Sequence, residues 1–70
     1  MTSICQGKDS WPELVGVSAR EAVKVIEEEN SLVTAIIVFP GQPIIGNFSC
    51  ARVWVFVNIF GKVNRVPVIG

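Results

Sequence analysis

Few side chains in this chain are of the types that carry out chemistry. The 70 residues include two cysteines, Cys5 and Cys50, and no histidine. Two thiolates do not complete the four ligands of a zinc site, and their spacing is not the C-x-x-C of a redox pair. No nucleophile has an evident base, because the carboxylates fall mainly on one predicted helix. We therefore expect no enzymatic activity, no metal and no cofactor.

The same two cysteines can instead stabilise a small fold. A chain of 70 residues builds one modest core, so we expect a single domain over residues 1–70. A disulfide between Cys5 and Cys50 would close a long loop and add roughly 2–4 kcal/mol to the free energy of unfolding. Two buried free thiols fit the residues equally well, and the residues alone do not decide between these alternatives.

Charge and hydropathy argue against two classes of partner. Six basic and six acidic side chains give a formal net charge of zero, and the basic residues are scattered, so there is no electrostatic footprint for nucleic acid. The longest apolar stretches are about as long as one strand, far short of a membrane span. We expect neither nucleic acid nor a membrane as a partner. Residues 1–7 lack the basic and apolar regions of a signal peptide, and the compartment is left open.

The first half of the chain predicts a turn and one helix. Residues 11–16 combine Trp11 with a proline and a terminal glycine, which suits a short turn that packs the indole inward. Ser18 and Glu21 have the spacing of a capping box at a helix start, and Asn30 is a plausible end. We interpret the acidic run 27–29 as a solvated face. The apolar stripe expected to face the core is Ala19, Ala22, Val23 and Ile26.

The second half of the chain predicts strands. Residues 33–39 form a largely β-branched run without alternation, as expected of a strand covered on both faces. Residues 52–58 alternate between valines and larger side chains. After a turn at residues 58–62, residues 63–66 are expected to pair antiparallel, with Pro67 ending the pairing. The predicted fold class is α+β, with one α-helix packed on a small mixed β-sheet.

Residues 40–51 lie between two strands and have an unusual composition. Gly41, Pro43 and Gly46 rule out a helix, so we expect a long exposed loop, and such loops in compact domains are usually functional. The loop also contains Ile44, Ile45 and Phe48. These apolar side chains either fold back onto the sheet or are displayed to a partner.

Three separated segments together resemble one protein family. They are Trp11-Pro12-Glu13-Leu14-Val15-Gly16, Arg52-Val53-Trp54-Val55-Phe56-Val57 and Val66-Pro67-Val68-Ile69-Gly70. In this order they are similar to the potato inhibitor I family of serine protease inhibitors, and the resemblance covers most of the chain. The positions of Cys5 and Cys50 resemble the plant members in which one disulfide ties the N-terminal arm to the loop, so the resemblance implies that bridge.

The resemblance implies a substrate-like inhibitor. A loop already held in its bound conformation avoids the ordering cost of a flexible substrate and therefore binds a protease more tightly. The family pattern places the scissile bond between Gly46 and Asn47. It implies that Pro43, Ile44, Ile45 and Phe48 contact the protease and that Arg52 and Trp54 support the loop.

The chain departs from the family pattern at residues in the loop and behind it. Members usually carry a threonine and an acidic residue around the acyl residue, where this chain has Ile45 and Asn47. The amide oxygen of Asn47 accepts with roughly half the strength of a carboxylate. Trp54 replaces a second supporting arginine, as in some plant members. Support of the loop is therefore expected to be weaker than in those members.

Gly46 affects the choice of target. The absent side chain forfeits about 1.5–3 kcal/mol of burial in the specificity pocket. Trypsin is expected to be a poor target, whereas elastase-like or subtilisin-like enzymes tolerate glycine better. Chymotrypsin-like enzymes are a further possible target class. The alternative is a non-inhibitory interaction or storage protein with Trp54 and Phe56 as its contact surface. Monomer and weak homo-oligomer both remain open.

Overall fold

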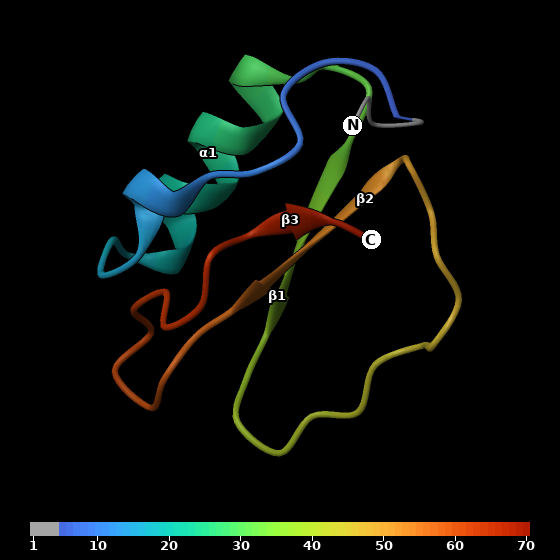
Figure 1. Ribbon diagram of the computed structural model, residues 1–70. Helices are drawn as coiled ribbons and strands as arrows, with labels where there is room; N and C mark the ends of the chain where they lie inside the picture. The colour runs from blue at the N-terminus through green and yellow to red at the C-terminus, as the bar shows by residue number, and fades with distance from the viewer. Residues whose placement is uncertain (1–4) are drawn as a thin grey trace.

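The computed structural model describes residues 5–70 and contains one helix packed on a small sheet. A 3-10 turn, η1 (Pro12–Leu14), precedes the helix α1 (Ala19–Glu29), and the strands β1 (Thr34–Val38), β2 (Arg52–Phe56) and β3 (Val68–Ile69) follow. Figure 1 shows α1 on one side of the sheet and a long loop on the other. The predicted α+β class is confirmed. Within residues 5–70, no helix reaches the length and apolar character that crossing a membrane requires.

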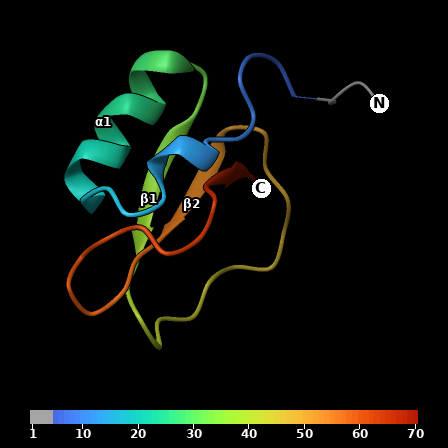
Figure 2. The same cartoon turned by 60° about the vertical axis from the view of Figure 1, so that its left-hand side comes forward.

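The sheet is mixed, and its strand order explains the loop. The order is β1-β2-β3, with β1 parallel to β2 from Thr34↔Arg52 to Val38↔Phe56 and β3 antiparallel to β2. Parallel neighbours need a connection that returns the chain to the starting edge of the sheet. Residues 39–51 make this return without a helix, and Figures 1 and 2 show them arching away from the sheet.

The helix start follows the predicted cap. The Ser18 hydroxyl accepts a hydrogen bond from the Glu21 backbone N–H at 3.3 Å, and Asn30 follows the last helical residue. Ala22 and Ile26 are fully buried. Val25, rather than the predicted Val23, is the partly buried helix valine that packs against the core, because residue 25 lies one turn beyond Ala22 on the same face.

The acidic run 27–29 is exposed, as expected of a solvated face, and two of its carboxylates also accept hydrogen bonds. Glu29 accepts hydrogen bonds from the Trp11 indole N–H at 3.0 Å and from the Lys8 ammonium at 2.7 Å. Glu27 accepts from the backbone N–H of Ala35 at 2.9 Å. The Ala35 N–H lies on the outer edge of β1, where no strand pairs with it. Two of the three carboxylates therefore fasten neighbouring segments to the end of α1.

The prediction that β1 is covered on both faces was wrong. Ala35 and Ile37 pack against the core, whereas Thr34 and Ile36 are exposed. The crossover loop that would have covered the second face stands away from the sheet (Figure 1). The β-branched run reflects strand propensity rather than burial on both sides.

The predicted last strand is confirmed only at its start. Val63 makes only an isolated antiparallel bridge with Val57, and β3 begins after Pro67 rather than ending before it. Pro67 is fully buried, and its carbonyl accepts a hydrogen bond from the Trp11 N–H at 2.9 Å. The Asn64 N–H still donates to the Phe56 carbonyl at 3.0 Å, and continuous pairing with β2 resumes at Val68.

Candidate functional site

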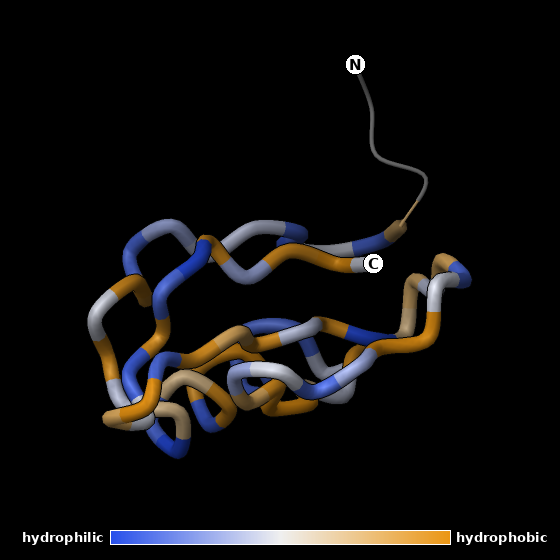
Figure 3. Tube along the Cα trace, turned by 90° about the horizontal axis from the view of Figure 1, so that it is seen from below, coloured by the Kyte–Doolittle hydropathy of each residue, from blue (hydrophilic) through white to orange (hydrophobic). Residues whose placement is uncertain are grey.

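The loop between β1 and β2 exposes its apolar side chains. Every residue from 40 to 48 is exposed, and Ile45 and Phe48 retain 66% and 58% of their accessible surface. The hydrophobic colour in Figure 3 extends into the projecting loop at the right. The possibility that these side chains fold back onto the sheet is therefore not realised. Their exposure leaves them available to a partner.

A disulfide holds the end of the loop. Cys5 and Cys50 are bonded across a sequence separation of 45 residues, with Cα atoms 5.3 Å apart. Cys5 is buried. Cys50 lies two residues before the start of β2. The bridge implied by the family resemblance is present, and the alternative of two free thiols does not apply. The disulfide ties the N-terminal arm to the base of the loop.

The arm that carries Cys5 is itself fixed to α1. The buried Asn30 side chain donates hydrogen bonds to the carbonyls of Gln6 at 3.0 Å and Lys8 at 2.9 Å. The Lys8 ammonium pairs with Glu13 at 2.5 Å and Glu29 at 2.7 Å. The hydrogen bond to Glu13, then that to Glu29, raises the pKa of Lys8, and the bond from Lys8 lowers the pKa of Glu13. Both shifts favour the ionised pair that secures the arm.

Arg52, the first residue of β2, reaches back into the loop. Its Nη2 donates to the carbonyl of Asn47, and its Nη1 lies 3.4 Å from the Asn47 side-chain oxygen. Its Nε donates to the main-chain oxygen of Gly70 at 2.9 Å, and the Gly70 N–H returns a bond of 2.9 Å to the Arg52 carbonyl. The guanidinium is thus positioned by Gly70, the residue after β3, and holds the loop at Asn47.

Trp54 supports this arrangement through Arg52. The Arg52 guanidinium lies over the Trp54 ring, with its Cζ 4.5 Å from the ring centroid. Phe56 lies two residues after Trp54 on the same face of β2, and the Cζ of Arg65 lies 4.2 Å from the centroid of its ring. Cation–aromatic stacking of this kind restricts the orientation of the guanidinium. Because arginines cover both rings and both are half-buried, the proposed contact surface on Trp54 and Phe56 is less open than the sequence implied.

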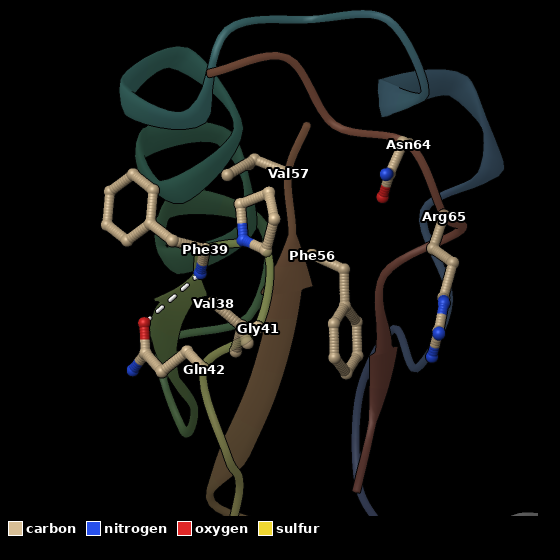
Figure 4. Close-up of a pocket in the computed structure, with 9 residues that line it drawn as sticks. Val38, Phe39, Gly41, Gln42, Phe56, Val57, Asn64 and Arg65 are labelled. Carbon is tan, nitrogen blue, oxygen red and sulfur yellow. Dashed lines mark hydrogen bonds between the residues drawn. The ribbon is translucent and has the colours of Figure 1, made fainter. Parts of the chain in front are cut away.

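The first part of the loop is closed by a turn that sequence reasoning missed. The Gln42 side-chain oxygen accepts from the Phe39 N–H at 3.1 Å, and the Gln42 N–H donates to the Phe39 carbonyl at 3.0 Å. Gly41 has a φ of +79°, which glycine adopts without strain. A shallow hollow of about 320 Å³ lies between this turn and the Phe56–Arg65 stack (Figure 4). The Pro40-Gly41 pair signalled a turn, but nothing in it pointed to Gln42.

Gly46 lies in open space. A Cβ atom built on it would meet no other atom within 4 Å, and its φ lies outside the left-handed region. A side chain can therefore be added at this position without the strain of a left-handed backbone. No group of three or more potential metal ligands is found within residues 5–70.

Comparison with known proteins gives a consistent result. The model of the potato inhibitor I family matches residues 4–70. The Glu S.griseus protease inhibitor of Momordica charantia is 52% identical over 68 residues, covering 97% of this chain and 100% of that protein. The inhibitor of trypsin and hageman factor of Cucurbita maxima is 46% identical over 68 residues, with coverage of 97% and 100%.

The fold agrees with these relatives. The crystal structure of bitter gourd trypsin inhibitor matches with a TM-score of 0.92 and 48% identity, covering 97% of this chain and 100% of that one. The exposed loop, the disulfide at its base and the arginine behind it thus occur within a fold that solved inhibitors share. The chain belongs to the potato inhibitor I family of serine protease inhibitors and is not an enzyme.

Proposed function

We propose that this protein inhibits a serine protease by presenting residues 43–48 as a substrate-like segment, with Gly46–Asn47 as the scissile bond. The proposal rests on the hydrogen bonds that the Arg52 guanidinium donates to Asn47, the first residue on the leaving side of that bond. The disulfide at Cys50 adds a covalent attachment three residues further along. An exposed peptide bond followed by a doubly attached segment is the arrangement that such an inhibitor needs.

The mechanism follows from this attachment. After the protease attacks the Gly46 carbonyl, the leaving amine belongs to Asn47. Because Arg52 and the disulfide keep Asn47 from diffusing away, the amine stays near the acyl group and can reform the peptide bond. The chain is then a substrate that is cleaved slowly and reversibly. Because the loop is ordered before binding, contacts with the protease are offset by less lost conformational entropy.

The target class depends on the loop residues rather than on the fold. The two named relatives carry different protease names at similar identity to this chain. Trypsin selects a cation in its specificity pocket, and residues 43–48 contain no basic side chain. We propose subtilisin-like or elastase-like enzymes as targets, since their sites tolerate a glycine at the acyl position. Ile44, Ile45 and Phe48 would supply apolar contacts to the neighbouring subsites.

Titration of four proteases tests the proposal. Subtilisin, elastase, chymotrypsin and trypsin are each titrated with the intact protein, and residual activity is followed over time. Slowing of subtilisin or elastase at lower concentration than trypsin is expected. The absence of slowing in all four at micromolar concentration would remove the proposal. Rapid cleavage at residues 45–47 without lasting inhibition would favour the alternative of a non-inhibitory interaction or storage protein.

A further inference from the structure

The turn between β2 and the Val63 bridge displays two large apolar side chains. Ile59 and Phe60 retain 80% and 77% of their accessible surface. They are more exposed than any other large hydrophobic residue that the structure describes, including Ile45 in the loop. Isolated exposed apolar residues are common, but two adjacent ones at the tip of a turn form a projecting apolar surface.

Hydrogen bonds from the Asn58 side chain and from the backbone hold this turn in its exposed position. The Asn58 side-chain oxygen accepts from the N–H groups of Phe60 at 2.9 Å and Lys62 at 3.1 Å. The Gly61 carbonyl accepts from the Ala19 N–H at 2.9 Å, which docks the turn against the start of α1. Ile59 and Phe60 therefore remain exposed unless these bonds break.

The protease does not account for this exposure. In Figures 1 and 2 the turn after β2 lies on the opposite side of the molecule from the projecting part of the loop. A protease bound at residues 43–48 would leave Ile59 and Phe60 uncovered. The turn is therefore a surface separate from the proposed inhibitory site.

The charges near the turn are mainly basic. Lys62 lies two residues after Phe60, and Arg20 follows Ala19, the residue that contacts the turn. Glu21 is the acidic residue at this end of α1, whereas the acidic run 27–29 lies at the other end. An apolar tip beside basic side chains is complementary to an anionic lipid surface, where apolar groups enter the interface and cations meet the headgroups.

The size of the tip favours lipid over protein. Stable protein interfaces bury about 1,200 Å² or more in total, which two side chains do not approach. A bilayer surface accepts a few apolar side chains together with nearby cations. We propose that Ile59 and Phe60 form a surface anchor that adsorbs to anionic membranes, with Lys62 and Arg20 on the headgroups. The earlier expectation of no membrane partner considered only spanning segments, and adsorption needs none.

Vesicle co-sedimentation tests the anchor on the whole protein. Vesicles of phosphatidylcholine with about one-third phosphatidylserine are compared with phosphatidylcholine alone. Binding to the anionic vesicles is expected, and added salt should weaken it. Phe60→Ser should lower the partition coefficient about tenfold, and Lys62→Gln about fivefold. Leu32→Ser is the matched control, because Leu32 is 59% exposed but lies at the acidic end of α1.

Three results would overturn the anchor. They are no sedimentation with either vesicle, equal loss of binding in Leu32→Ser and Phe60→Ser, and a dimer in sedimentation velocity that Phe60→Ser dissociates. The last would assign the turn to self-association. Protease inhibition is measured in the same variants and should be unchanged, so failure of the anchor is distinguishable from failure of the inhibitory site.

Discussion

Residues 47–51 and residues 43–46 belong to one exposed loop, yet they are held differently. Asn47 is bonded to Arg52, and Cys50 is bonded to Cys5. Residues 43–46, by contrast, make no hydrogen bond within the described part of the chain. The nearest attachment on that side is the turn closed by Gln42. The leaving side of the proposed scissile bond is therefore held by hydrogen bonds and a disulfide. The acyl side is held only by its covalent connection to the turn at Gln42 and to Asn47.

This difference suggests where inhibition depends on this chain's own residues. In a substrate-like inhibitor the leaving segment must stay in place after cleavage, whereas the acyl segment is attached to the enzyme. Fixing the leaving side therefore matters more for reversibility. At Ile45, where the family pattern has a threonine, the acyl side has no side-chain hydroxyl that could support it. The following variants separate the contributions of the two sides.

Removing the disulfide should have the largest effect. In the double variant Cys5→Ser with Cys50→Ser, the free energy of unfolding should fall by about 2–4 kcal/mol, because the unfolded chain regains its freedom. Denaturant unfolding of the variant and the parent measures the difference. The reduced parent should unfold like the variant. Equal midpoints for variant and oxidised parent would contradict this prediction.

Arg52→Ala should be next in size. The variant loses the hydrogen bonds to Asn47, and a net value of about 1.5–3 kcal/mol for bonds to a charged group predicts inhibition weaker by about 10- to 100-fold. Cleavage of the loop should become faster at the same time. The inhibition constant against subtilisin and the cleavage rate by mass spectrometry measure both. Arg20→Ala, on the exposed face of α1, is the control and should inhibit like the parent.

Gly46→Leu acts on the acyl side. It restores a side chain for the specificity pocket, and burial of about 1.5–3 kcal/mol predicts chymotrypsin inhibition stronger by about 10- to 100-fold. The position tolerates the change because no atom lies within 4 Å of a Cβ built there. Inhibition constants for chymotrypsin give the answer. Gly41→Leu and Gln42→Leu are unsuitable as controls, because Gly41 has a φ of +79° and the Gln42 side chain closes the turn at the start of the loop. An unchanged constant in Gly46→Leu would show that the register is wrong.

Asn47→Asp should have the smallest effect. A carboxylate would accept a charge-assisted bond from Arg52, which is about twice as strong as a neutral one. Inhibition of subtilisin should become stronger by about fivefold near neutral pH, and the gain should disappear as the carboxylate is protonated at acidic pH. Titrations at both pH values measure it. The double variant Asn47→Asp with Arg52→Ala should show no gain.

Local signals in the sequence predicted much of the fold. The Ser18 cap, the alternation of residues 52–57 and the glycines and prolines of the loop each act over a few residues, and the structure agrees with them. The family resemblance predicted the bridge between Cys5 and Cys50. The cap, the alternation and the loop are each determined by residues within the segment itself.

The features that were missed depend on contacts between distant segments. Glu27 bonds to the edge of β1 eight residues away, and Asn30 bonds to Gln6 across 24 residues. Pro67, the residue before β3, accepts a hydrogen bond from the Trp11 N–H, 56 positions earlier in the chain. A run of three glutamates gives no indication of which carboxylate finds a partner, since that depends on how the helix packs.

The central claim is that Gly46–Asn47 is a slowly and reversibly cleaved bond whose leaving side stays attached. Intact protein and protein cleaved at this bond are each incubated with a trace of subtilisin, and the two forms are separated and their masses and N-termini determined. We expect cleavage only before Asn47, fragments joined through Cys5 and Cys50, and the same ratio of intact to cleaved chain from both starting points. Cleavage at another bond, or complete conversion to fragments, would contradict the account.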